Sequence, residues 1–414
     1  MRARLRPPRV PARRYQRRLS RTDPPQLLTV TWPLGAIIES PNAELSNITI
    51  AIVIRLPEIA QFRSLERKAL GGFLEFRLIP VLLWSYTSVV LGTALAARQQ
   101  GTFDPWLLAI ALTLSGLVQG WVTHSINEIY DWRSGTDRDP RPRALSGGSK
   151  VRNLGLLTER DLWVIFTAST AGVALLGGFV AVSRAPWLLL LVISGYGLGV
   201  AYTLPPLATA YRPFLGEWLG GFPGVLLAGL GAYGIQTRTL SWTALAAISA
   251  HALVCSAMLV MHHYQDAPSD ARASPPKRTT VVALGPVRSR WYATFLAASA
   301  AVAYSVLALV SHPAFLFGAG LSLLAAFLHF RTDLSRLESI TRNELRIIQL
   351  GIAAGLATSV AMVPSLWPLI PIASLGYLGH LRAAAPPAEL SRAWRRAGHR
   401  SAEEGNSAGP LSEP

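Results

Sequence analysis

Long apolar runs dominate the middle of this 414-residue chain. Many extend for about twenty residues with few charges, the length that a helix needs to cross the hydrocarbon of a bilayer. The pattern predicts an all-α, polytopic membrane helix bundle of about nine transmembrane helices, near residues 76–97, 105–126, 161–182, 187–207, 214–235, 242–264, 291–311, 313–330 and 345–364. A further apolar piece, 366–381, is short and contains Pro368 and Pro371, so we expect it to lie along the membrane interface.

The two ends of the chain differ from this middle part. Nine arginines lie between Arg2 and Arg21, and the first acidic residue is Asp23. Residues 1–70 are therefore interpreted in one of three ways: as a disordered basic arm on the cytoplasmic membrane face, as a targeting peptide, or as an upstream extension that occurs in the deduced sequence but is not translated in the cell. The first and third interpretations are favoured. We expect a transmembrane domain over 71–381 and a disordered polar tail over 382–414.

Charge and composition support a membrane location. Half of the residues are hydrophobic, only 15% are charged, and the formal net charge is +16. In a soluble protein that charge would suggest a nucleic-acid partner, but here the basic residues gather in loops beside membrane spans, so we expect none. The single cysteine, Cys255, excludes an intrachain disulfide and a Cys-rich metal site.

The distribution of basic residues predicts an orientation. Loops 127–160 and 266–290 are rich in Arg and Lys, whereas the alternate loops carry few cations, such as Arg98, Arg184 and Arg238. Cytoplasmic loops carry the excess of Lys and Arg. We therefore expect an integral protein of the cytoplasmic membrane, of bacterial type, whose acidic loops face the cytoplasm.

One of these loops begins with a cluster of acidic side chains directly after the apolar run 105–126. Asn127 and Asp131 are four residues apart, so they share one face of a helix. Gly135 offers a point where the helix can stop and the chain can fold back toward Asp137. Carboxylates beside lipid are costly, which makes them a functional-site hypothesis. Three oxygen ligands around one point suit a hard cation such as Mg²⁺.

A second acidic cluster follows another apolar run. Asp266 and Asp270 come directly after the predicted span 242–264. Two acidic helix ends, far apart in sequence, predict a common pocket. Because Mg²⁺ takes one or two carboxylates and completes its shell with substrate phosphates, this pattern with nearby cations predicts a metal–diphosphate site.

Several short motifs occur in a fixed order at the ends of these spans. They are Asn127-Glu128-x-x-Asp131 with Asp137, Ser146-Gly147-Gly148-Ser149, Ala201 to Leu207, Tyr211-Arg212 with Glu217, and Asp266 with Asp270 followed by Lys277-Arg278-Thr279. In this order they resemble the UbiA superfamily of intramembrane prenyltransferases, in particular the 1,4-dihydroxy-2-naphthoate polyprenyltransferase-like branch. The resemblance covers about residues 70–365.

The resemblance implies a helix bundle around a central cavity, with Mg²⁺ held by the aspartate motifs and a prenyl tail in a channel open to lipid. The implied activity is Mg²⁺-dependent transfer of a polyprenyl group from polyprenyl diphosphate to an aromatic acceptor, such as 1,4-dihydroxy-2-naphthoate or a related precursor in menaquinone- or ubiquinone-type biosynthesis. Taken residue by residue, the candidate metal ligands are Asn127, Asp131, Asp137, Asp266 and Asp270, with Glu128 as a possible further ligand, and the candidate catalytic residues are Asp131, Asp266, Lys277 and Arg212.

Candidate contacts of the diphosphate are Arg141, Lys150, Tyr202, Arg212, Lys277 and Arg278, since Arg grips phosphate in bidentate fashion and Lys acts as a point charge. For any single cation the alternative is anchoring at the membrane surface, and for Tyr202 it is packing in the core. Glu217, an acid inside an apolar run, needs a partner such as Arg212 or a substrate hydroxyl.

The chain departs from the family pattern around both motifs. Glu128 stands for the usual Asp, and Pro268 separates Asp266 from Asp270, so these two cannot be assumed to share a helical face. His262 and His263 stand where relatives often have Asn. We interpret them, with His124, as pocket lining, with deprotonation of the acceptor as the lesser alternative for one of them.

Three other functions stay open. As a relative of this family, the protein could use another acceptor, such as a tetrapyrrole or a glycerol phosphate lipid, or it could have lost activity. In a different class, the carboxylates could serve a cation-coupled transporter. Transporters place their coupling sites near the bilayer midplane, whereas these acids lie at helix ends, which favours the enzyme.

Overall fold

The computed structural model describes residues 56–101, 103–138 and 148–384. The chain forms two units, 1–66 and 67–414. All regular structure in the described ranges is helical, which confirms the predicted all-α class. Most of the expected N-terminal extension and of the polar tail lies outside the described residues. The last part of the extension, from Leu56, belongs to a helix.

The first half of the bundle contains α1 (Leu56–Glu75), α2 (Leu78–Val81), α3 (Thr87–Gln100), α4 (Pro105–Gly116), α5 (His124–Ser134), α6 (Glu159–Ser183) and α7 (Leu188–Ala201). The second half contains α8 (Phe222–Thr237), α9 (Trp242–Arg272), α10 (Thr280–Leu284), α11 (Pro286–Val310), α12 (Phe315–Arg331), α13 (Leu337–Met362) and α14 (Leu369–Ala384). Three π-helical segments, Leu82–Tyr86, Leu117–Thr123 and Gly216–Gly221, and two 3₁₀ turns, Thr209–Tyr211 and Pro364–Leu366, complete the described elements.

Each predicted span corresponds to one helical stretch. Seven stretches in the described part of the chain are long and apolar enough to cross a membrane: Ser64–Gln100, Pro105–Ser134, Glu159–Ser183, Gly216–Thr237, Trp242–Arg272, Pro286–Val310 and Leu337–Met362. The other two predicted spans correspond to the shorter apolar helices α7 and α12. The protein is therefore an integral membrane protein.

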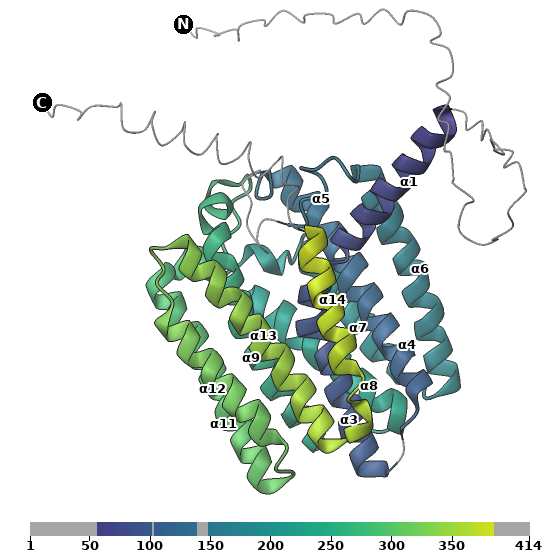
Figure 1. Ribbon diagram of the computed structural model, residues 1–414, viewed down its shortest axis with the longest axis vertical. Helices are drawn as coiled ribbons and strands as arrows, with labels where there is room; N and C mark the ends of the chain where they lie inside the picture. Colours follow the sequence, from purple (N-terminus) through teal and green to yellow (C-terminus); the bar gives the residue numbers. More distant parts are fainter. Residues whose placement is uncertain (1–55, 102, 139–147, 385–414) are drawn as a thin grey trace, which may run out of the picture. The chain divides into compact units, whose positions relative to one another are not determined.

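The sequence predicts that residues 366–381 lie along the membrane interface, but most of them form helix α14 of the bundle. It runs lengthwise beside α13 rather than across the helix ends (Figure 1), and Gln349 of α13 donates to the Tyr377 hydroxyl of α14 at 3.3 Å. The prolines do not prevent this, because Pro368 precedes the helix and Pro371 lies in its first turn, where no helical partner for an N–H is required.

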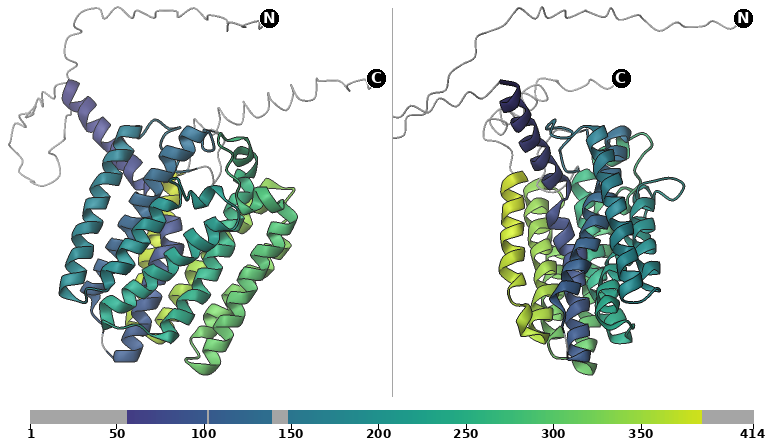
Figure 2. Two further views of the ribbon diagram at one scale, coloured as in Figure 1. Left: turned by 180° about the vertical axis from the view of Figure 1, so that it is seen from behind. Right: turned by 90° about the vertical axis from the view of Figure 1, so that its right-hand side faces the viewer.

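The order of helices across the bundle places α9 in the interior. Helices α11 and α12 lie side by side at one edge and α6 lies at the opposite edge (Figures 1 and 2). Helices α3 and α9 are mostly buried between them, and their fully buried side chains include Leu91, Ile248 and Met258. Residues from α9 therefore contact both halves of the chain.

Close backbone contact joins α3 to α8. A Cβ atom built on Gly92 would lie 2.1 Å from the carbonyl oxygen of Gly229. Small residues let membrane helices approach this closely, and dispersion contacts then hold them together. The pair thus sets the spacing of two helices in the centre of the bundle.

We expect Gly92→Ala to destabilise the protein by about 1–3 kcal/mol, the usual cost of overpacking, because backbone rather than a flexible side chain must move. The measurement is the thermal midpoint of the purified protein in detergent. Gly178→Ala in α6 is the matched control, because nothing lies within 4 Å of its added Cβ. Equal midpoints for the two variants would contradict the packing argument.

Candidate active site

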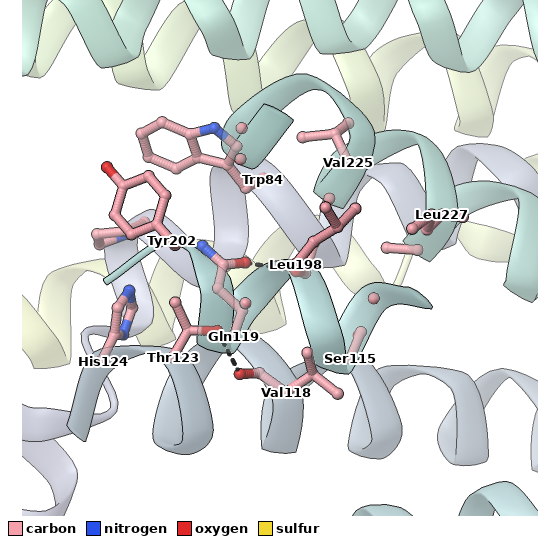
Figure 3. A pocket seen from close by; sticks show the side chains of 18 of the residues that line it. Trp84, Ser115, Val118, Gln119, Thr123, His124, Leu198, Tyr202, Val225 and Leu227 are labelled. Carbon is pink, nitrogen blue, oxygen red and sulfur yellow. Dashed lines mark hydrogen bonds between the residues drawn. The ribbon is translucent and has the colours of Figure 1, made fainter. Parts of the chain in front are cut away.

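A cavity of about 240 Å³ lies inside the bundle. At one end its wall is polar and charged, with Arg77, His124, Asn127, Asp131, Asp137, Tyr202, His262, His263, Asp266 and Lys277. Away from that end the wall is apolar, with Leu114, Val118, Val180, Leu188, Leu191 and Ile235. Figure 3 shows Tyr202, His124 and Trp84 on one side of the cavity and Val225 and Leu227 on the other. One space thus joins a polar compartment to an apolar one.

The three π-helical segments all contribute to this wall. Trp84 and Ser85 come from the first segment, Gln119 and Thr123 from the second, and Gly220 and Gly221 from the third. The Ser85 hydroxyl donates to the Gln119 side chain, and the Thr123 hydroxyl donates to the Val118 carbonyl at 2.9 Å (Figure 3). Such insertions into α-helices often occur at functional sites, because they redirect side chains locally.

The first acidic cluster lies at the end of α5. The Asn127 amide donates to the Asp131 carboxylate at 3.0 Å, so the two side chains share one helical face. The helix ends at Ser134, and Gly135 follows in a left-handed conformation with φ 93°. The chain then folds back, and the Asp137 amide donates to the Asp131 carbonyl at 3.2 Å. Asn127, Asp131 and Asp137 consequently line the same cavity.

The second acidic cluster lies inside α9 rather than after it. This helix continues through Pro268 to Arg272, so Asp266 and Asp270 are four residues apart in one helix. Asp266 lines the cavity, and Asp270 is fully buried and accepts the Lys277 backbone amide on its carbonyl at 2.9 Å.

Lys277 joins the two clusters. Its Nζ donates to Asp131 Oδ2 at 2.6 Å, and the Tyr211 hydroxyl donates to Asp131 Oδ1 at 2.7 Å. Burial alone would lower the pKa of Lys277, but the negative charges of Asp131 and Asp270 outweigh it and raise the pKa above its usual value. The backbone of Ser274 also donates to the Ser134 carbonyl at 2.9 Å. The loop after α9 is thus fixed against the end of α5.

A further group of acids lies against Gly148 and Ser149. The Ser149 amide donates to Glu128 at 2.9 Å, and its hydroxyl donates to Glu75 at 2.6 Å. Burial, with the negative charges of Asp131 and Glu128, raises the pKa of Asp137 well above its usual value. Gly148 has φ 74°, and a Cβ there would lie 2.5 Å from both Asp137 and Glu128. Only glycine allows the chain to pass between these carboxylates.

The other predicted contacts of the diphosphate lie in different places. Tyr202 lines the cavity and follows directly on α7. Arg212 and Arg278 are exposed, and Arg212 donates to the Pro206 carbonyl at 2.8 Å. Lys150, with φ 64°, lies near enough to Glu128 to interact with its charge. Arg141 lies outside the described residues.

Glu217 has a protein partner other than Arg212. Its carboxylate accepts the Thr280 hydroxyl at 2.9 Å, so Arg212 is not the group that compensates its burial in the described structure.

Sequence reasoning missed four site residues, Glu75, Arg77, Tyr211 and Glu344. Arg77 lines the cavity from a break between α1 and α2, where its own backbone is left-handed with φ 51°. A cation at the start of an apolar run could have indicated it, and Tyr211 lies within a motif already noted. Nothing in the local pattern around Glu75 or Glu344 indicates that their side chains meet Ser149 and His262.

The donor atoms fit a hard divalent cation. In the described part of the chain there is no group of three His, Cys, Asp or Glu side chains close enough to hold a metal ion. Mg²⁺ does not require such a group, because substrate phosphates and waters usually fill most of its shell. Asp137 Oδ2 and Glu128 Oε1 are buried and have no hydrogen-bond partner among the described residues. Such oxygens favour a cation.

A bilayer-spanning helix bundle with charged groups at one end of its cavity and apolar walls at the other is suited to a substrate with an anionic head and a lipid tail. The chain belongs to the UbiA prenyltransferase family, whose model matches residues 85–350. It is therefore a transferase.

The chain is also similar to individual proteins, in sequence or in fold. The chain is 29% identical to 1,4-dihydroxy-2-naphthoate octaprenyltransferase of Bacillus subtilis (strain 168) over 220 residues, which cover 53% of this chain and 67% of that protein. A UbiA homologue from Aeropyrum pernix K1 has a similar fold, with a TM-score of 0.50, 16% identity and coverage of 69% of this chain and 98% of that chain. A structure from work on digeranylgeranylglyceryl phosphate synthase also has a TM-score of 0.50, with 13% identity and coverage of 73% and 99%.

We expect Gly148→Ala to lower prenyl transfer at least about tenfold, because the added methyl group would push Asp137 and Glu128 apart, and shifts of about 1 Å in a site cost this much or more. Gly155→Ala is the matched control. Gly155 has a similar φ of 62°, but only the tip of Arg67 lies near its Cβ, at 4.0 Å. The measurement is transfer activity in membranes, and a similar loss in both variants would indicate backbone strain alone.

Proposed function

We propose that this protein catalyses Mg²⁺-dependent transfer of a polyprenyl group from polyprenyl diphosphate to an aromatic acceptor, such as 1,4-dihydroxy-2-naphthoate, in quinone biosynthesis. The observation that carries the proposal is the single cavity that contains Asp131, Asp266 and Lys277 at one end and apolar walls at the other. The similarity to the octaprenyltransferase of Bacillus subtilis supports this choice of acceptor.

The polar end suits the diphosphate of the donor. Asn127, Asp131, Asp137 and Asp266 line it and are the proposed holders of Mg²⁺, with Glu128 and Asp270 buried beside them. Bound there, the metal would neutralise negative charge on the leaving diphosphate. Lys277 and Arg77 line the same space, so their charges can stabilise the developing diphosphate anion. Both side chains would act on the leaving group.

The exposed cations have a different proposed role. Arg212 and Arg278 lie on loops beside the polar end rather than in the cavity wall. Cations around a cleft raise the local concentration of anionic ligands. We assign to them the attraction of the donor, while Lys150 and Arg141 stay predicted contacts of the diphosphate.

The apolar part suits the prenyl tail. Cavity-lining residues extend along the span that contains α8 from Gly220 to Ile235, about 22 Å at 1.5 Å per residue. Several positions along this wall, including Gly224 and Gly231, have no side chain to fill the space. An apolar wall of this length favours a lipid chain, and it excludes water that would otherwise capture a reactive allylic cation.

The distribution of charge supports the proposed orientation of the site in the membrane. Arg133, Arg152, Arg272 and Arg288 lie near the ends of helices at the polar end of the cavity, whereas Arg98, Arg184 and Arg238 lie at the opposite helix ends. The excess of cations belongs on the cytoplasmic side. The proposed location is a bacterial cytoplasmic membrane, with the diphosphate site open to the cytoplasm.

We expect Asp131→Asn and Asp266→Asn each to lower product formation by about 10²–10³, because loss of one preorganised electrostatic contact costs this much. Membranes that contain the protein are incubated with geranylgeranyl diphosphate, 1,4-dihydroxy-2-naphthoate and Mg²⁺, and the prenylated product is measured by mass spectrometry. Asp333→Asn, at an exposed position between α12 and α13, is the control. Unchanged product from either cavity variant would count against the assignment.

We expect Gly231→Phe to discriminate between donors by length. No atom lies within 4 Å of a Cβ at Gly231, which lines the apolar wall, so a ring there would occupy the space proposed for the tail. Transfer from long polyprenyl diphosphates should fall at least about tenfold, with transfer from geranyl diphosphate retained. Gly320→Phe, on the exposed side of α12, is the control. Equal loss for all donors would contradict this tail position.

A further inference from the structure

A buried polar network lies in the cavity wall between α9 and α13. His262 lines the cavity, and its Nδ1 lies 2.9 Å from Glu344 Oε1. Gln265 donates to Glu344 Oε2 at 2.9 Å and to the Thr341 hydroxyl at 3.0 Å. Glu344 is fully buried. Glu344 is not among the residues that line the cavity, whereas its hydrogen-bonding partner His262 is.

A buried carboxylate within a membrane-spanning helix is costly and calls for a functional explanation. Both oxygens of Glu344 lie at hydrogen-bond distance from nitrogen atoms, one on His262 and one on Gln265. A carboxylate that accepts from Nδ1 fixes the imidazole in the tautomer whose Nε2 carries a lone pair. It also stabilises the imidazolium that forms when Nε2 takes a proton. This is the arrangement of an oriented base.

We propose that His262, positioned by Glu344, accepts the hydroxyl proton of the aromatic acceptor. The inference rests on the proposed function, and it adds the acceptor side of the site, on the wall formed by α9 and α13. Glu344 acts through His262 and is a positioning residue. Gln265 donates a hydrogen bond to the second oxygen of Glu344 and so keeps the carboxylate oriented toward the imidazole.

The chemistry of the acceptor explains why a base is useful. When the hydroxyl proton moves to Nε2 of His262, the electron density of the aromatic ring rises. A ring carbon then forms a bond to C1 of the prenyl group as the C1–O bond breaks, and the diphosphate leaves with the electron pair. The ring regains aromaticity when the proton on that carbon moves to the oxygen. The proton on His262 is finally released to water. General bases typically contribute about 10²–10⁴ in rate.

Other charged and titratable groups surround this pair. From α9, His263 lies with its ring centre 6.1 Å from that of His262, and Asp266 interacts with Glu344. From α5, His124 is near enough to interact with His262, and Arg77 from the α1–α2 break interacts with Glu344. These groups stay the same in the comparisons below, so differences between variants report on His262 and Glu344.

The test compares His262→Gln and Glu344→Gln with the unmodified full-length protein in lipid nanodiscs. Substrates are geranylgeranyl diphosphate, Mg²⁺ and 1,4-dihydroxy-2-naphthoate, and kcat and both KM values are measured over a range of pH. Glu338→Gln, an exposed position near the start of α13, is the matched control. Binding of geranylgeranyl diphosphate with Mg²⁺ shows that each variant is folded.

We expect His262→Gln to lower kcat by about 10²–10⁴ near neutral pH, with the donor KM unchanged. Glu344→Gln, which keeps the shape of the side chain but removes its charge, should lower kcat about tenfold or more. Both losses should shrink as the pH rises, because a hydroxyl that ionises in solution no longer needs the base. Glu338→Gln should match the unmodified protein.

The possible outcomes distinguish a failure of the proposed function from a failure of the inferred role of His262. If the unmodified protein forms no product, the proposed function fails, and the inference fails with it. If the unmodified protein is active and the loss in His262→Gln is absent, or is the same at every pH, the network only links α9 to α13 and the inference is overturned. Should His262→Gln fail to bind the donor, the pH dependence of Glu344→Gln decides in the same way.

Discussion

The ion pair between Lys277 and Asp131 is the interaction on which the site depends. It joins two segments that lie 146 residues apart in the chain, at 2.6 Å. Both side chains are buried, so each charge would be costly without the other. Tyr211 and the Ser134–Ser274 backbone hydrogen bond reinforce the same junction. The two halves of the bundle consequently present their acidic helix ends to one cavity.

The cavity also depends on irregular helices. Regular α-helices of Leu, Ile and Ala would pack side chain against side chain and fill the interior. Here π-helical segments interrupt two of the spans and begin a third at the level of the cavity, and glycines such as Gly220 and Gly221 face it. Elsewhere Gly92 brings α3 into backbone contact with α8. The bundle is thus tightly packed in one part and open in another, which gives an amphipathic ligand a defined place.

Much of this arrangement could be predicted from the sequence. Apolar runs gave the position and order of the spans, since a bilayer sets the length of each helix. The spacing of Asn127 and Asp131, with Gly135 behind them, gave the turn that returns Asp137 to the cavity. The roles of Arg77 and Glu344 could not be predicted, because they depend on a left-handed break between helices and on which face of α13 meets α9. Local patterns do not contain such tertiary information.

The structure shows how the chain accommodates Pro268 and the two histidines around the second acidic motif. From sequence, Pro268 and the two histidines raised the prospect of a weakened site. In the structure α9 continues through Pro268, and Asp266 still lines the cavity. The altered side chain His262 faces the same cavity and is held from behind by Glu344, a residue of a different helix. Under the proposed function, α9 keeps the acid that serves the diphosphate end and carries, one turn earlier, a supported imidazole that serves the acceptor side.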